Sequence, residues 1–160
     1  IKPGLTVLDL GAAPGSWSQL LVKLVGPQGR VVGIDLSECK FQHANYRFIQ
    51  QDIFTIDFEA LCAELGIEQF DVVVSDMAPK TTGIKSADQA KSTALCESAL
   101  LVAAKTLRKK GHFVCKLFHS DDFQVLKKQI LAQFEKFEAL KPDSTRQISK
   151  EIFLIGIQKK

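Results

Sequence analysis

The chain has 160 residues, 46% of them hydrophobic and 24% charged, which is the composition of an ordinary soluble globular domain. Its formal net charge of +3 permits an acidic partner such as RNA but does not require one. No apolar run approaches the ~20 residues that a membrane span needs, and the four cysteines contain no C-x-x-C pair, so we expect neither a membrane segment nor a metal site. Reduced cysteines favour a cytoplasmic location, and the length favours a single domain over residues 1–160.

Apolar runs bounded by glycine and polar residues predict the strands of one sheet. The expected strands are Val7–Leu10, Arg30–Asp35, Tyr46–Gln50, Phe70–Ser75, Phe113–Phe118, Phe137–Leu140 and Ile152–Ile157. Helical spacing predicts helices after Gly15, over Asp57–Leu65, over Ala87–Arg108 and after the cap Ser120-Asp121-Asp122. The expected apolar faces are Trp17, Leu20, Leu21 and Leu24 in the first helix and Phe123, Leu126, Ile130 and Phe134 in the last.

The order of these elements predicts the fold class. Strands alternate with helices over most of the chain, which is typical of an α/β, Rossmann-like fold with a mostly parallel seven-stranded sheet and helices on both faces. No helix separates the last two strands, so the final strand should be antiparallel to its neighbours. Ligands of such sheets bind at the carboxyl edge of the strands.

A strand, a tight turn and a helix meet at Gly11-Ala12-Ala13-Pro14-Gly15. Backbone N–H groups at such a turn can point at a ligand. Gly11 would let the chain reverse and a ligand approach the backbone, and Gly15 would let the helix begin close to the strand. The alternative is an ordinary turn that binds nothing.

Acids follow the next two strands. Asp35 lies 24 residues after Gly11, which is the expected place for a carboxylate that accepts hydrogen bonds from a ribose. Asp52, just past the third strand, could reach an adenine amine, although either acid could instead be a solvated strand end. The turn lacks the G-x-G-x-x-G pattern of an NAD site and looks more like the first motif of S-adenosylmethionine (SAM) methyltransferases.

Lys116 interrupts a strand that is otherwise apolar. Lysine is rarely buried unless it is paired, and burial favours the neutral amine, the form that can act as a general base. Asp76 ends the fourth strand and Glu151 opens the last one. If the last strand is antiparallel, both carboxylates should converge on Lys116; the alternative is a lysine that reaches out to solvent.

Four segments resemble the FtsJ-type ribosomal RNA large-subunit methyltransferases, in collinear order and over essentially the whole chain: VLDLGAAPGSWSQ, DVVVSDMAPKTTG, FVCKLF and KPDSTRQISKEIFLIG. The resemblance implies methylation of a ribose 2′-hydroxyl with SAM as the cofactor. It also implies a K-D-K-E catalytic set whose last three members are Asp76, Lys116 and Glu151. The implied cofactor contacts are Gly15, Trp17, Asp35, Asp52 and Asp76, to which the turn itself adds Gly11.

Two positions depart from the family pattern. The first catalytic lysine of the family lies in a helical segment before the K-P-G turn, whereas this chain starts at that turn, and Lys2 belongs to the turn. We therefore expect the N-terminal segment of the family to be absent from this chain. Ser16 stands where a second glycine is common, and it is also small.

The expected function is SAM-dependent 2′-O-methylation of a nucleotide, a uridine, in large-subunit ribosomal RNA. The expected form is a cytoplasmic monomer that acts on RNA within the large ribosomal subunit. Basic residues that could contact phosphates are Lys80, Lys85, Lys91, Arg146 and Lys150; Arg108-Lys109-Lys110 and Lys159-Lys160 are interpreted as solubility charges. The alternatives are a SAM methyltransferase for tRNA, a small molecule or a protein, and a non-catalytic RNA-binding module.

Overall fold

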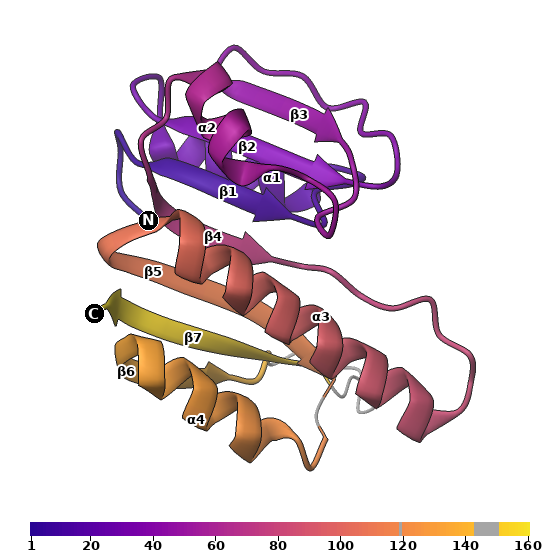
Figure 1. Ribbon diagram of the computed structural model, residues 1–160. Coiled ribbons are helices and arrows are strands. Elements are labelled where there is room, and N and C mark those ends of the chain that lie inside the picture. Colours follow the sequence, from indigo (N-terminus) through magenta and orange to yellow (C-terminus); the bar gives the residue numbers. More distant parts are fainter. Residues whose placement is uncertain (119, 143–150) are drawn as a thin grey trace.

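One sheet organises the computed structural model, which describes residues 1–118, 120–142 and 151–160. Its strand order is β3-β2-β1-β4-β5-β7-β6 (Figure 1). The strands are β1 (Thr6–Leu10), β2 (Arg30–Asp35), β3 (Tyr46–Gln50), β4 (Phe70–Ser75), β5 (Leu107–Phe118), β6 (Phe134–Leu140) and β7 (Glu151–Lys159). Strands β1 to β5 pair in parallel, and β7 is antiparallel to both β5 and β6. The predicted mostly parallel sheet with an antiparallel last strand is therefore confirmed.

Helices cover both faces of the sheet, as predicted. Helix α1 (Ser16–Val25) packs on one face, against valines of β1, β2 and β4. Helices α2 (Phe58–Leu65), α3 (Lys85–Thr106) and α4 (Phe123–Gln133) pack on the other face, in the larger of the two hydrophobic clusters (Figure 1). Within the described ranges, no helix is both long enough and apolar enough to cross a membrane.

The strand order reverses beside β1, which pairs with β2 on one side and with β4 on the other. The chain runs outward from β1 through β2 to β3 and then returns to β4. Connections at such a switch point diverge and leave a crevice at the carboxyl ends of the strands. Gly11 and Asp76 directly follow the two strands that flank this point.

The buried face of α1 differs from the expected one. Leu20 and Leu24 are 56% and 40% exposed, whereas Leu21, Val22 and Val25 are buried together with Ser18. The hydroxyl of Ser18 donates to a carboxylate in the sheet core. This contact turns the helix so that its buried stripe lies about one residue, or roughly 100°, from the apolar stripe that the sequence suggests.

The boundary between α3 and β5 also differs from the prediction. Helix α3 ends at Thr106, and β5 begins at Leu107 rather than at Phe113. Charged residues that looked like a helix end instead form ion pairs with residues of β4 and β6. Arg108 contacts Asp71 of β4, with 2.5 Å between Nε and Oδ1, and Lys110 contacts Glu135 of β6.

Helix α4 begins at Phe123, directly after the predicted cap Ser120-Asp121-Asp122, so neither aspartate lies in its first turn. Asp122 is the capping residue but makes no side-chain cap, because its carboxylate accepts a hydrogen bond from the hydroxyl of Thr93 on α3 at 2.9 Å. At the other end, the helix stops at Gln133. Phe134, predicted in the helix, is the first residue of β6 and is buried there.

Lys159 and Lys160, interpreted from the sequence as solubility charges, cap two helices. The Nζ atom of Lys159 donates to the carbonyl oxygens of Ala104 and Leu107 at 2.5 and 2.8 Å, at the end of α3. Lys160 donates to the carbonyl of Leu131 near the end of α4. Terminal carbonyls of a helix lack partners within it and carry partial negative charge, so these ammonium groups stabilise both ends.

Replacing Lys159 with methionine should therefore destabilise the fold. Hydrogen bonds to a charged group contribute roughly 1.5–3 kcal/mol, but burial lowers the pKa of Lys159, and this desolvation offsets part of the gain. We expect the free energy of unfolding to fall by about 1–2 kcal/mol, measured by urea denaturation. Lys128→Met, at an exposed position on α4, is the matched control; an equal loss in both variants would show that the cap contributes nothing.

Candidate active site

Asp76, Lys116 and Glu151 come from three segments and lie together at the carboxyl edge of the sheet. Asp76 follows the last residue of β4, Lys116 lies near the end of β5, and Glu151 begins β7. Because β7 is antiparallel to β5, Glu151 pairs with Phe118 at the edge where the parallel strands end. The structure thus brings together the three side chains that the sequence placed far apart.

The Nζ atom of Lys116 lies 2.8 Å from Oδ1 of Asp76 and 3.7 Å from Oε1 of Glu151. The Lys116 side chain is only 11% exposed, so it does not reach out to solvent. Both carboxylates are more accessible than the amine, and they compensate its buried charge. An amine held in this way can keep or accept a proton at a fixed position beside the crevice.

Buried thiols support the strand at Lys116. The Sγ atom of Cys96 on α3 donates to the carbonyl oxygen of Lys116 at 2.9 Å. Cys115, which precedes Lys116 in β5, is almost fully buried. Its hydrogen bond with Cys96 and its burial both raise the pKa of the Cys115 thiol. All four cysteines are free thiols in the structure, and Cys96 and Cys115 are buried in the core as expected.

A pocket of about 320 Å³ lies at the same edge and includes Asp76 in its wall. Asp35, Asp52 and Gly11 line it as well, so it gathers four of the six predicted cofactor residues. Its apolar lining consists of Ala13, Ile34, Leu36, Ile53, Phe54, Met77, Ala78 and Leu95. Carboxylates thus face a site that is otherwise largely apolar.

Asp35 and Asp52 are held in place by their own backbone surroundings. The carboxylate of Asp35 accepts hydrogen bonds from the N–H groups of Ala13 at 3.0 Å and Ser37 at 2.7 Å. Asp52 accepts from the N–H of Phe54 at 2.9 Å. Asp35 therefore fixes the glycine turn, and each carboxylate keeps lone pairs for further donors.

Gly15 and Trp17 do not line this pocket, and the two glycines are explained by contacts within the chain. A Cβ atom at Gly11 would lie 2.8 Å from Cγ of Met77, and one at Gly15 would lie 2.8 Å from Cβ of Phe41. Both glycines also have positive φ, 77° and 111°. Gly15 thus leaves room for Phe41, in the segment before β3. The expected reason, a close approach of α1 to β1, is not the one that the structure gives. Trp17 packs on Phe153 of β7, with ring centroids 5.5 Å apart.

The sequence analysis missed a buried polar network beneath the turn. Asp9 of β1 is fully buried, and its Oδ2 accepts a hydrogen bond from the Ser18 hydroxyl at 2.6 Å. The Ser18 hydroxyl also lies 3.1 Å from the Tyr46 hydroxyl, which in turn lies 3.8 Å from the Sγ of Cys39. An acid inside an apolar strand was the available signal, the same kind of signal that marked Lys116.

A second carboxylate that the sequence analysis did not single out orders the loop between β4 and α3. Asp88 accepts hydrogen bonds from the backbone N–H and the hydroxyl of Thr82 at 2.7 and 2.8 Å, and from the N–H of Gly83. The backbone hydrogen bond from Thr82 is the main cause that lowers the pKa of Asp88. The carboxylate is therefore ionised at neutral pH and closes a loop that starts at the active-site edge.

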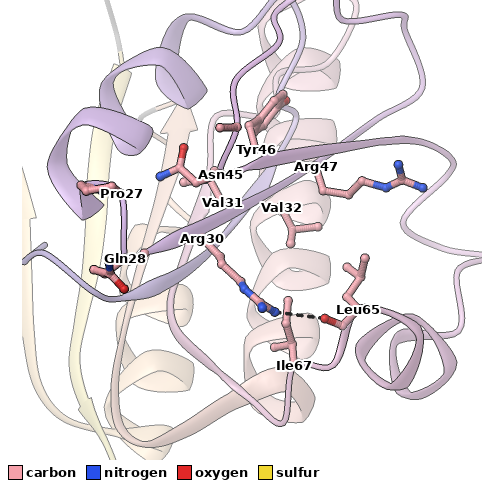
Figure 2. A pocket seen from close by; sticks show the side chains of 12 residues that line it. Pro27, Gln28, Arg30, Val31, Val32, Asn45, Tyr46, Arg47, Leu65 and Ile67 are labelled. Atoms are coloured by element: carbon pink, nitrogen blue, oxygen red, sulfur yellow. Dashed lines mark hydrogen bonds between the residues drawn. The ribbon is translucent and has the colours of Figure 1, made fainter.

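A larger cavity, of about 560 Å³, lies elsewhere (Figure 2). It is formed at the amino ends of β2 and β3 by residues that include Arg30, Asn45 and Arg47. Arg30 is engaged there with the carbonyl oxygen of Leu65 at 3.1 Å. None of the predicted site residues lines this cavity, so the size of a cavity alone does not identify the active site.

The residues of the smaller pocket fit SAM. SAM presents ribose hydroxyls and an adenine amine as hydrogen-bond donors, a flat purine, and positively charged sulfonium and ammonium groups. Carboxylates are acceptor-only and negatively charged, so Asp35, Asp52 and Asp76 complement these groups. The exposed side chains of Leu36 and Phe54 give the pocket an apolar rim suited to the purine.

Basic side chains border the same edge. Lys80 lies in the loop after β4, and Lys85 and Lys91 lie in the first turns of α3; all three are exposed. Two further expected phosphate contacts, Arg146 and Lys150, lie outside the described residues. Exposed cations near an active site suit a polyanionic substrate.

The FtsJ-like methyltransferase family model matches residues 1–159. A ribosomal RNA large subunit methyltransferase E of Bdellovibrio bacteriovorus is 58% identical over 160 residues, covering 99% of this chain and 82% of that protein. A protein of the same name from Desulfatibacillum aliphaticivorans is 48% identical. The match covers 100% of this chain and 77% of that protein.

Solved structures share the fold. A Plasmodium falciparum protein described as a ribosomal RNA methyltransferase superposes with a TM-score of 0.87 at 24% identity, covering 99% of this chain and 88% of the other. An Aeropyrum pernix fibrillarin with bound SAM superposes with a TM-score of 0.65 at 16% identity. The match covers 98% of this chain and 67% of the fibrillarin. The chain therefore belongs to the FtsJ-like methyltransferase family and uses SAM as its cofactor.

Proposed function

We propose that this chain transfers the methyl group of SAM to a ribose 2′-hydroxyl of large-subunit ribosomal RNA. One observation carries the proposal: Asp76 lines the cofactor pocket and also contacts the buried amine of Lys116 at 2.8 Å. A methyl donor in this pocket would therefore lie close to the amine that we propose as the proton acceptor. The names of the relatives that are 58% and 48% identical support ribosomal RNA as the substrate.

When bound, SAM supplies an electrophilic methyl group on a sulfonium sulfur. Lys116 would accept the proton of the 2′-hydroxyl at its Nζ atom as that oxygen becomes methylated. Asp76 and Glu151 hold the Lys116 amine in position, and they compensate the ammonium that forms. Fixing the amine beside the hydroxyl converts an encounter of separate groups into a positioned one.

Two carboxylates face the single amine of Lys116, so a second cation beside the cluster would balance their charge. We assign that role to the first lysine of the family's K-D-K-E set.

The finer proposals concern the target and the working form. We propose a uridine as the target nucleotide, RNA within the large ribosomal subunit as the substrate, and a cytoplasmic monomer as the active species. The exposed lysines at the carboxyl edge would contact backbone phosphates and so position the RNA without reading its sequence.

Methyl transfer from labelled SAM tests the function. The substrates to compare are free large-subunit ribosomal RNA, assembled large subunits and bulk tRNA, followed by digestion and identification of the methylated nucleoside. We expect label in a 2′-O-methylated nucleoside of large-subunit RNA, and 2′-O-methyluridine for the finer proposal. Methylation of a base, or preference for tRNA, would contradict the assignment of substrate.

A further inference from the structure

Asp9 is a buried acid with an incomplete set of partners. It lies in β1, the strand at the switch point of the sheet, and its side chain is fully buried. One carboxylate oxygen accepts the hydrogen bond from Ser18. The other, Oδ1, has no hydrogen-bond partner among the described residues. A buried carboxylate without full compensation is costly while it is charged.

Among the residues that the structure describes, the groups around Asp9 do not supply a positive charge. Ser18 comes from α1, and the Tyr46 hydroxyl and Cys39 thiol extend the chain of contacts toward β3. Burial raises the pKa of Asp9 to about 6, the Ser18 hydrogen bond opposes this, and the carboxylates of Asp76 and Asp35 raise it further. Those two carboxylates line the cofactor pocket, from the segments after β4 and at the end of β2.

We propose that SAM binding is coupled to the release of a proton from Asp9, which acts as a positioning residue beneath the cofactor turn. The pocket walls next to Asp9 carry negative charge, and the cofactor brings a net positive charge, because its sulfonium and ammonium cations outweigh its one carboxylate. Positive charge in the pocket offsets the repulsion from Asp35 and Asp76 and stabilises the ionised form of Asp9. Because SAM stabilises the ionised form of Asp9, linkage requires that SAM also binds more tightly when Asp9 is ionised.

The sign of the pH dependence follows directly. Well above pH 6 Asp9 is ionised in the free protein, so SAM affinity is constant there. Below pH 6 the free protein binds a proton that SAM must displace, so the affinity falls. Because each pH unit below the pKa changes the ionised fraction about tenfold, the dissociation constant should rise about tenfold between pH 7 and pH 5.

Calorimetric titration with SAM from pH 5 to pH 8 tests the proposal. Runs in two buffers of different ionisation enthalpy should reveal proton release that is maximal near pH 5 and absent at pH 8. The uncharged nucleoside 5′-methylthioadenosine is the ligand control and should bind with much weaker pH dependence. Asp71→Asn, at a carboxylate that pairs with Arg108 rather than facing the pocket, should keep the wild-type profile.

Two variants assign the effect to Asp9. Asp9→Asn should bind SAM with an affinity that is nearly constant from pH 5 to pH 8. Ser18→Ala removes the hydrogen bond that favours the ionised carboxylate, so it should move the midpoint of the profile to higher pH. This second variant tests the proposal even if Asp9→Asn does not fold. A flat profile for the unaltered chain, or an unchanged midpoint in Ser18→Ala, would overturn the proposal.

Discussion

Replacing Lys116 with alanine should lower the rate of methyl transfer at least ~10²-fold, the low end for removal of a general base. The affinity for SAM should stay nearly unchanged, because Lys116 does not line the cofactor pocket. Lys116→Arg should be as inactive as the alanine variant. Arginine preserves the positive charge beside Asp76 and Glu151 but stays protonated at any working pH, so it cannot accept the hydroxyl proton. Single-turnover methylation of large-subunit RNA, with SAM affinity measured in parallel, gives both quantities.

Lys109→Ala is the matched control, because Lys109 is an exposed lysine of the same strand. It should retain full activity. Substantial activity in Lys116→Arg would show that the ammonium charge, rather than proton acceptance, is what Lys116 supplies. Activity retained in both Lys116 variants would remove the residue from the mechanism altogether.

The topology could be predicted because strand-length apolar runs and glycine turns are local signals. Strands such as Val72-Val73-Val74 are buried on both faces and so are continuously apolar. The convergence at the active site followed from one topological inference, the antiparallel last strand, which places Glu151 at the same edge as Asp76. Lys116 was visible because an isolated charge in an apolar strand needs a partner.

Features that depend on distant contacts could not be predicted. The buried stripe of α1 is set by Ser18 reaching Asp9, and no periodicity within the helix reports this contact. The end of α3 is fixed by Lys159, more than fifty residues later in the chain, which bonds to the carbonyl of Ala104. Asp9 carried the same signal as Lys116, but a short acid beside a glycine motif is easily taken as part of the turn.

Replacing Asp35 with alanine should weaken SAM binding by roughly 1.5–3 kcal/mol, the scale of lost hydrogen bonds to a charged acceptor. This corresponds to a dissociation constant about 10- to 150-fold higher. The backbone N–H groups of Ala13 and Ser37 fix the carboxylate before any cofactor arrives, so little ordering is needed on binding. The same two contacts mean that the substitution also loosens the glycine turn, and the experiment has to separate the two effects.

A thermodynamic cycle separates them. Adenosine and 2′,3′-dideoxyadenosine differ only in the ribose hydroxyls, and the unaltered chain should prefer adenosine. If Asp35 binds the ribose, Asp35→Asn should lose most of this preference, because asparagine keeps the shape but loses the charge and one acceptor oxygen. Asp57→Ala, which removes the N-cap of α2 and costs about 1 kcal/mol of stability, should leave the SAM affinity unchanged. An Asp35→Asn variant that binds SAM weakly yet keeps the full preference for adenosine would mean that Asp35 supports the turn and does not touch the ribose.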